Sequence, residues 1–374
     1  MGHREVSALE ATATTPAEAV SAADGEPFIA RAKAHADSVL RPAALETDRR
    51  GVTPEEVSEL AALGLLNHTA PAEFGGAAIG RAGDRRLHEI IAGSCFNTWL
   101  VWAQHAPMVG RLALEHQKGA QLSGLSHDVL AGRVLLGAAI SDVRRFPHSY
   151  IAATRTGDGW TFSGTISWVS GWGLNTVLVV AAVEASTQTV VTAFVPIGDR
   201  VRVARLELGA VGGSRTERVT LDDVSVPASD VIYIQSLTDW RKEDLGTAGD
   251  TRPQYFGLAA TVLDELDEAA HPGARRVARV WRPRIDELRT DAYGLADEAK
   301  AAADERHRIS ERVATKVATG EALGTITRAL VVTRSGRGIS LDDTAQLHAR
   351  SALFLLVQGQ SADVRDAQLA RLAR

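Results

Sequence analysis

The sequence is nearly free of cysteine, with Cys95 as the one thiol in 374 residues. One thiol cannot form an internal disulfide, and it cannot build a metal site from cysteine ligands. Cys95 lies in an apolar run beside Phe96 and Trp99. This setting predicts a buried structural thiol, and we expect no metal site.

An excess of positive charge and a long apolar run are also lacking. Lys and Arg number 41 against 46 Asp and Glu, for a net charge of −5, which gives no reason to expect nucleic acid or an anionic membrane as partner. No apolar run approaches the roughly 18–20 residues of a membrane span. The first residues have neither the positive nor the apolar part of a signal peptide. We therefore expect a disordered tail over 1–26 and a cytoplasmic protein.

What is present is the composition of a globular protein, 45% hydrophobic and 23% charged, and long enough for two or three domains. Apolar residues recur at helical spacing over 27–132, and Thr53-Pro54-Glu55-Glu56 is a typical helix start. The pattern changes to period two over 133–235, which predicts an antiparallel β-domain. Helical signals return over 236–374. The fold class is α+β, in three parts.

The most informative stretch is 157–173, GDGWTFSGTISWVSGWG. Gly157, Asp158 and Gly159 predict a hairpin turn. Aromatic and β-branched residues follow as a strand, and Gly164 marks a bulge or a close backbone approach. On pattern alone this is a buried hairpin.

Two further stretches extend this interpretation, 60–76 (LAALGLLNHTAPAEFGG) and 206–227 (LELGAVGGSRTERVTLDDVSVP). In their order and spacing, the three stretches resemble the acyl-CoA dehydrogenase superfamily of flavoproteins. The resemblance covers roughly residues 30–374. It implies N-terminal helices, a middle β-domain, a C-terminal helical bundle and a bound flavin, FAD with FMN as the alternative.

The resemblance also implies site residues. Trp168-Val169-Ser170 matches the family step in which the Trp packs on the flavin ring and the hydroxyl reaches its N5 edge. Ser141 stands where another flavin hydrogen bond would come from. The family's Gly-Ser turn for the substrate phosphate is missing after Ser141, which puts a standard CoA thioester in doubt. Arg144 and Arg145 follow there and could meet an anionic group.

Two glycine-rich turns carry arginines suited to phosphate. Arg215 follows Gly212-Gly213-Ser214, and such a turn offers backbone N–H groups beside a planar guanidinium. Gly336-Arg337-Gly338 resembles the family step that touches the flavin diphosphate of a neighbouring subunit. If so, the flavin site is shared, and we expect a homodimer or homotetramer.

The family's proton-abstracting glutamate is replaced by Gln358 here. An amide has no useful basicity near neutral pH and cannot act as a general base. Some members carry the base on the first helix of the C-terminal domain, near Thr247 here, which makes Asp250 the candidate substitute. His105 belongs to a region whose helices wall the substrate cavity in the family.

Three functions stay open. The first is a flavin-dependent dehydrogenase that oxidises an acyl thioester, CoA- or carrier-linked, or a related small molecule, with an electron-transfer protein as partner. The second is a two-component monooxygenase that receives reduced flavin from a separate reductase, with Gln358 and His105 orienting the substrate. The third is a flavin-binding scaffold without turnover.

Overall fold

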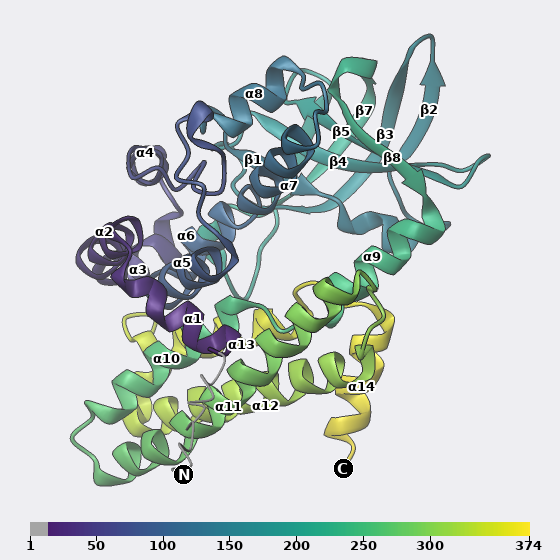
Figure 1. The fold of residues 1–374 in the computed structure, drawn as a ribbon. Helices are drawn as coiled ribbons and strands as arrows, with labels where there is room; N and C mark the ends of the chain where they lie inside the picture. The colour runs from purple at the N-terminus through teal and green to yellow at the C-terminus, as the bar shows by residue number, and fades with distance from the viewer. Residues whose placement is uncertain (1–13) are drawn as a thin grey trace, which may run out of the picture.

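The computed structural model describes residues 14–374 (Figure 1). Helices form the first part: α1 (Pro16–Ala22), α2 (Pro27–His35), α3 (Arg41–Arg50), α4 (Pro54–Ala62), α5 (Arg81–Ser94), α6 (Phe96–Trp102), α7 (Ala106–Gln117) and α8 (Gly124–Leu130). The strands are β1 (Leu136–Ala139), β2 (Ala152–Thr156), β3 (Gly159–Val169), β4 (Val177–Glu184), β5 (Thr189–Pro196), β6 (Val201–Ala204), β7 (Glu217–Val226) and β8 (Val231–Ser236). The last part is again helical: α9 (Leu237–Gly249), α10 (Pro253–Asp267), α11 (Pro272–Ala302), α12 (Ile309–Arg334), α13 (Thr344–Val357) and α14 (Ala362–Leu372).

The predicted disordered tail is partly a helix. The Thr15 side chain accepts from the backbone N–H of Glu18 and the Glu18 carboxylate accepts from Thr15, which forms a capping box at the start of α1. Val20 is fully buried where α1 packs on α5 and α11. The prediction of disorder was wrong for 16–22. The composition of this segment does not show that Val20 packs into the hydrophobic core. Residues 1–13 of the predicted tail lie outside the described part.

The strands form one sheet in the order β6-β7-β3-β2-β4-β5-β8, with β1 also pairing with β4. Most pairs are antiparallel, as predicted, but β1 and β2 both run parallel to β4. The β2–β3 hairpin closes from Thr156 to Gly159 around a two-residue turn, which confirms the turn prediction. A register shift between β3 and β7 falls at Gly164, whose φ of 142° few other residues adopt. The predicted bulge is confirmed.

Strand β4 is buried on both faces of the sheet. Leu178, Val180 and Ala182 belong to the core that β4 shares with β3, β5 and β7, whereas Val177 and Val179 belong to the cluster beneath α7 and α8. Successive residues of a strand point to opposite faces, so an unbroken apolar run needs cover on both sides. Figure 1 shows α7 and α8 over the sheet.

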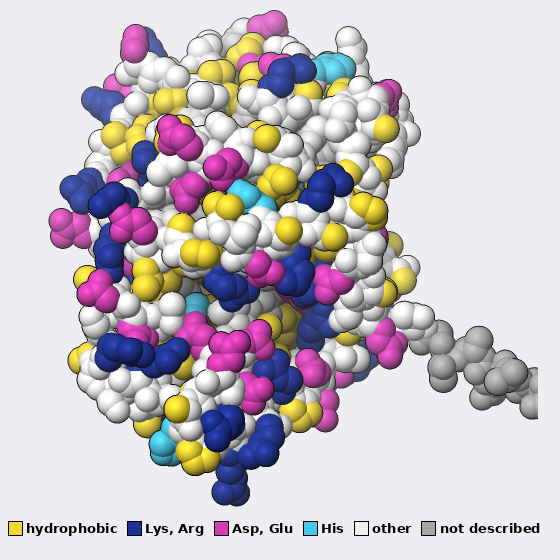
Figure 2. Space-filling model, turned by 90° about the vertical axis from the view of Figure 1, so that its left-hand side faces the viewer, with side chains coloured by type: hydrophobic (Ala, Val, Ile, Leu, Met, Phe, Trp, Pro, Cys, Tyr) yellow, Lys and Arg dark blue, Asp and Glu magenta, His cyan; other side chains and the backbone are white. Residues whose placement is uncertain are grey.

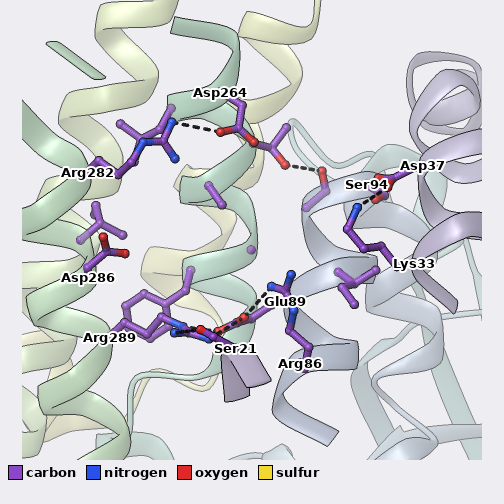
Figure 3. A pocket seen from close by; sticks show the side chains of 18 of the residues that line it. Ser21, Lys33, Asp37, Arg86, Glu89, Ser94, Asp264, Arg282, Asp286 and Arg289 are labelled. Carbon is purple, nitrogen blue, oxygen red and sulfur yellow. Dashed lines mark hydrogen bonds and ion pairs between the residues drawn. The ribbon is translucent and has the colours of Figure 1, made fainter. Parts of the chain in front are cut away.

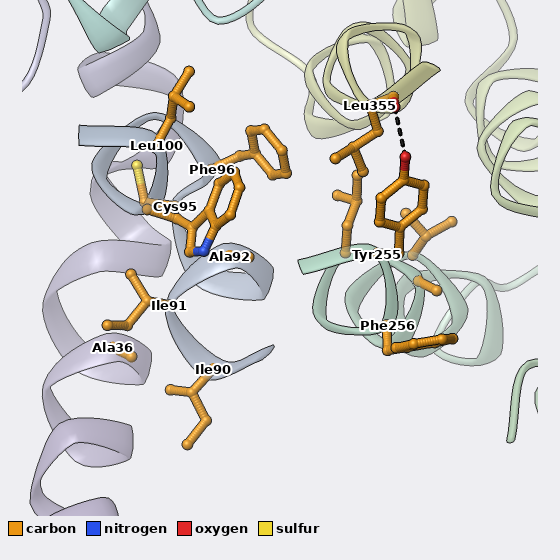
Figure 4. Packing of buried hydrophobic residues seen from close by; sticks show 14 of the residues in the cluster. Ala36, Ile90, Ile91, Ala92, Cys95, Phe96, Leu100, Tyr255, Phe256 and Leu355 are labelled. Atoms are coloured by element: carbon orange, nitrogen blue, oxygen red, sulfur yellow. Dashed lines mark hydrogen bonds between the residues drawn. The ribbon is translucent and has the colours of Figure 1, made fainter. Parts of the chain in front are cut away.

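A second core joins the N-terminal helices to the C-terminal bundle. It contains residues of α2, α3, α5, α6, α10, α11, α12 and α13. Figure 4 shows Cys95, Phe96 and Leu100 on the N-terminal side facing Tyr255 and Leu355 on the bundle side. Cys95 is 1% exposed, which confirms the buried thiol. Its burial raises the pKa of the thiol.

The surface carries both charges. On the face shown in Figure 2, Lys and Arg side chains are interspersed with Asp and Glu side chains, and neither sign dominates. Between residues 14 and 374 the chain forms no helix that combines the length and the apolar character needed to cross a membrane.

Candidate functional site

The end of β3 presents Trp168 and hides its two neighbours. Trp168 is 41% exposed, and its ring stacks on Phe354 of α13 with 6.2 Å between centroids and 22° between planes. Val169 is fully buried in the sheet core. The Ser170 hydroxyl lies 2.8 Å from the hydroxyl of Thr216 and is largely buried. Of the three predicted residues, only Trp168 offers a large open surface.

Ser141 stands beside this strand end. The Asp142 carboxylate accepts hydrogen bonds from the backbone N–H and the hydroxyl of Ser167, at 2.9 and 2.6 Å, which fixes the turn against β3. Ser141 itself is exposed. Arg144 instead forms two 2.7 Å bonds with Asp244 of α9, so its guanidinium is engaged within the fold. Arg145 is more open, 55% exposed and 3.7 Å from Asp142.

The turn Gly212–Ser214 is joined to the β3 end through the backbone. Gly171 N–H donates to the carbonyl of Ser214, and Trp172 N–H donates to that of Arg215. Arg215 has a left-handed backbone, with φ of 50°. Its buried Nε has no hydrogen-bond partner within residues 14–374. A guanidinium with a free donor in such a place can receive an oxyanion.

Gln358 ends α13 and is held by a residue of α10. The amide nitrogen of Gln254 donates to Oε1 of Gln358 at 2.9 Å, and Gln254 is 5% exposed. The next residue, Tyr255, donates its hydroxyl to the carbonyl of Leu355 at 2.6 Å, which ties the same two helices together (Figure 4). Phe354, which stacks on Trp168, is one helical turn before Gln358. The structure thus brings Gln358 to the side of the molecule where Trp168 lies.

Asp250 is tied to a buried arginine. Nε of Arg312 lies 2.7 Å from Oδ1 of Asp250, and Arg312 is 3% exposed. Desolvation lowers the pKa of the neighbouring Lys316 to about 7, while its Nζ donates to the carbonyl of Ala248. Lys316 is therefore a group in this cluster that can exchange a proton near neutral pH, whereas Asp250 is engaged in an ion pair.

His105 is a core residue. It is fully buried, its Nε2 lies 2.5 Å from the carbonyl of Leu66, and its Nδ1 accepts from the backbone N–H of Leu136 at 3.3 Å. The two ring nitrogens thus join the start of α7 to the segment after α4 and to β1. These contacts give His105 a structural role, and its orientation of a substrate stays a prediction.

Acid is expected to destabilise the fold through His105 and His88. Burial lowers the pKa of both to about 4, whereas an unfolded chain has them near 6.5. Between these values the unfolded state binds more protons, so the free energy of unfolding falls as the pH falls from 6.5 to 4, by up to about 3 kcal/mol for each group. Urea unfolding at a series of pH values measures this. His105→Gln should flatten the dependence, and the exposed His148→Gln should not; equal slopes for both variants would contradict the assignment.

The turn Ser335–Ile339 lies away from these residues. It precedes α13, whereas Gln358 follows it, and the 14 residues between rise about 21 Å. Arg337 is 68% exposed and its Nε donates to Asp343 at 2.8 Å. Gly338 packs closely on α12, since a Cβ there would lie 2.7 Å from the Val331 carbonyl. Within one chain, Gly336, Arg337 and Gly338 are not brought to the end of β3.

Sequence reasoning missed Gln254, Phe354 and Lys316. Gln254 and Gln358 are 104 positions apart, and no motif links them. In the sequence, Phe354 and Lys316 have no feature that distinguishes them from other helix residues. In the described part of the chain, no group of three or more His, Cys, Asp or Glu side chains could hold a metal ion.

Comparison with known proteins identifies the architecture. Residues 23–127 match the family model of the acyl-CoA dehydrogenase N-terminal domain. The chain is 24% identical over 378 aligned residues to 3-sulfinopropanoyl-CoA desulfinase of Paraburkholderia xenovorans (strain LB400), covering 88% of this chain and 91% of that protein. Both matches support the acyl-CoA dehydrogenase superfamily for this chain.

Solved structures of this superfamily fold extend over nearly the whole chain. KijD3 in complex with FMN and a dTDP-linked amino-keto sugar superposes with a TM-score of 0.77 at 19% identity, covering 96% of each chain. Glutaryl-CoA dehydrogenase of Mycobacterium smegmatis in complex with FADH2 superposes with a TM-score of 0.73 at 15% identity, covering 92% of this chain and 93% of that one. The three-part α+β architecture predicted from the sequence is that of the superfamily.

Proposed function

We propose that this chain binds a flavin at the end of β3 and acts on a small organic molecule by oxidation and reduction. The support is the superfamily fold, the FADH2 and FMN bound by two proteins of this fold, the open surface of Trp168 and the unpaired buried Nε of Arg215. A bound flavin supplies hydride or electron transfer. FAD is the first choice and FMN the second.

The residues present fit such a group. Trp168 offers an aromatic face, Ser170 and Thr216 offer hydroxyls at its side, and Arg215 offers a free donor for phosphate. Gly171 and Gly173 have φ of 78° and 82°, a conformation that favours glycine, so the loop beside Trp168 carries no side chain at these two positions. The chain would act as a homodimer or homotetramer, with Gly336, Arg337 and Gly338 reaching a neighbouring subunit's site.

The Gln254–Gln358 pair carries the assignment of the reaction class. An amide held by another amide can bind and orient a substrate, but it cannot remove a proton. The carboxylate of Asp250 forms an ion pair with Arg312. We therefore propose a reaction that needs no carboxylate base, and a monooxygenase supplied with reduced flavin by a separate reductase meets this condition.

The test is the reaction of the reduced, flavin-loaded protein with oxygen, followed by stopped-flow absorbance. We expect an absorbance phase that persists before the spectrum of oxidised flavin returns. A direct, single-phase return would contradict the oxygenase and leave the second candidate.

The second candidate is a reaction of an acyl thioester, favoured by the match to a desulfinase that acts on an acyl-CoA. Gln358→Glu discriminates between the two, because it restores a carboxylate at the superfamily's base position. Anaerobic bleaching of the flavin by butyryl-CoA in this variant would show that the site accepts acyl thioesters. Absence of bleaching in a variant that still binds flavin would favour the oxygenase.

Trp168→Ala should weaken flavin binding at least tenfold, about 1.4 kcal/mol, because an aromatic contact surface is lost. The free energy of unfolding should change by less, since the ring is 41% exposed. Fluorescence titration with flavin measures the affinity. Trp281→Ala, a partly buried tryptophan of α11, is the matched control and should leave the affinity unchanged. Equal affinities for both variants would place the flavin elsewhere.

A further inference from the structure

A cavity of about 290 Å³ lies between the N-terminal helices and the C-terminal bundle. Its sides are formed by α2 and α3 on one hand and α11 on the other, with α5 and α10 between them (Figure 3). Gly93 and Gly257, which line it, let α5 and α10 cross closely there, because a Cβ on either would meet the backbone of the other helix. None of the residues proposed above to bind flavin lines it.

One side of the cavity has more positive than negative charge. Lys33 and Arg41 share the carboxylate of Asp37, and Arg41 approaches it only to 3.5 Å. Away from this pair, Arg86 of α5 and Arg289 of α11 bind Glu89 at 3.1 and 2.6 Å, and Arg86 also binds Asp24, so the charges of this group balance. Because Lys33 and Arg41 share one carboxylate, N–H donors of this pair remain for another anion.

The opposite side has a surplus of negative charge. Arg282 of α11 lies 3.0 Å from Asp264 of α10. Asp286, one turn further along α11, also lines the cavity, and within residues 14–374 its carboxylate makes no hydrogen bond or ion pair. In Figure 3, Arg282 and Asp286 lie on the left, whereas Lys33 and Asp37 lie on the right.

Ser94 is an independent sign of a ligand. It lines the cavity, it is 4% exposed, and its buried hydroxyl has no hydrogen-bond partner among the described residues. A buried hydroxyl left without a hydrogen-bond partner is unfavourable, because it has lost its bonds to water. A polar group bound in the cavity would satisfy it.

We propose that this cavity binds a small zwitterion of the amino-acid class, with its ammonium at Asp264 and Asp286 and its carboxylate toward Lys33 and Arg41. Lys33, Arg41, Arg86, Arg282 and Arg289 line the cavity with Asp37, Glu89, Asp264 and Asp286, five cations against four carboxylates. Arg86 also pairs with Asp24 just outside, which brings the balance to five against five. The charges of the cavity cancel in total but are separated in space. Such a cavity favours a ligand that carries a positive group at one end and a negative group at the other over a simple anion or amine.

The test uses isothermal titration of the full chain, loaded with flavin, with ω-amino acids of increasing length: β-alanine, 4-aminobutyrate, 5-aminopentanoate and 6-aminohexanoate. Pentylamine and pentanoate are the controls that each lack one charge. We expect one member of the series to bind at least tenfold more tightly than either control. No binding by any member, or equal binding by the controls, would overturn the proposal.

Variants assign the binding to this cavity. Asp286→Asn and Arg41→Gln should each weaken the best probe at least tenfold. Asp291→Asn makes the same change at an exposed position of α11 outside the cavity and should have no effect. Undiminished binding in Asp286→Asn and Arg41→Gln would overturn the assignment. The proposal is independent of the flavin chemistry, so Trp168→Ala should leave zwitterion binding unchanged.

Discussion

Replacing Arg312 by methionine is expected to lower the free energy of unfolding by about 3–5 kcal/mol. Arg312 is 3% exposed; its guanidinium bonds to Asp250 at 2.7 Å, to the carbonyl of Gly246 at 2.6 Å and to that of Glu305 at 2.8 Å. The methionine side chain fills much of the space but donates nothing, so a mostly buried carboxylate and two carbonyls lose their partner. Urea unfolding at pH 7 measures the loss.

The matched control is Arg371→Met. Arg371 pairs with Glu321 at the surface and is 53% exposed, and such pairs contribute about 0–1 kcal/mol. Adding Asp250→Asn to Arg312→Met should recover part of the loss, because the orphaned charge is then gone. If Arg312→Met costs no more than the control, the ion pair does not form in solution. Asp250 would then be a free carboxylate that can act as a base, and the dehydrogenase hypothesis would be favoured again.

Gly257→Ala is expected to cost about 3 kcal/mol or more. Helices α5 and α10 cross so closely that a Cβ on Gly257 would lie 2.1 Å from the carbonyl oxygen of Glu89. On the other helix, a Cβ on Gly93 would lie 2.6 Å from the Gly257 carbonyl. Since both obstacles are backbone atoms, the helices themselves must move apart. Urea unfolding again gives the magnitude.

Gly324→Ala is expected to raise the free energy of unfolding, whereas Gly257→Ala lowers it. Gly324 lies inside α12, and a Cβ there meets nothing within 4 Å. Alanine should therefore stabilise the helix by about 0.5–1 kcal/mol. A Gly257→Ala protein as stable as the parent would mean that α5 and α10 do not touch at this crossing. The cavity that Gly93 and Gly257 line would then have a different shape between α5 and α10.

Local patterns were predicted well where neighbouring residues decide the structure. The turn at Gly157-Asp158, the irregularity at Gly164 and the helix start at Thr53 all follow from backbone preferences over a few residues. The alternation of β3 likewise separates open Trp168 from buried Val169. These features needed no knowledge of distant segments.

The site residues were predicted less well, because their chemistry depends on what packs against them. His105 has the right residue type and region, yet both its nitrogens are used by Leu66 and Leu136. Arg144 was a candidate for anions and is satisfied by Asp244, 100 positions away. Burial and pairing of this kind cannot be deduced from spacing.

The sequence by itself determined the succession of helices, strands and helices, the strand that carries Trp168, and the presence of an amide and not a carboxylate at position 358. These are properties of short segments, set by side-chain period, turn chemistry and residue type. Only the tertiary structure decided that Gln254 holds Gln358, that Arg312 occupies Asp250, and that charges of opposite sign face each other across a cavity beside Ser94. Hydrogen bonds and desolvation act between atoms in contact, and those contacts exist only after distant segments have packed together.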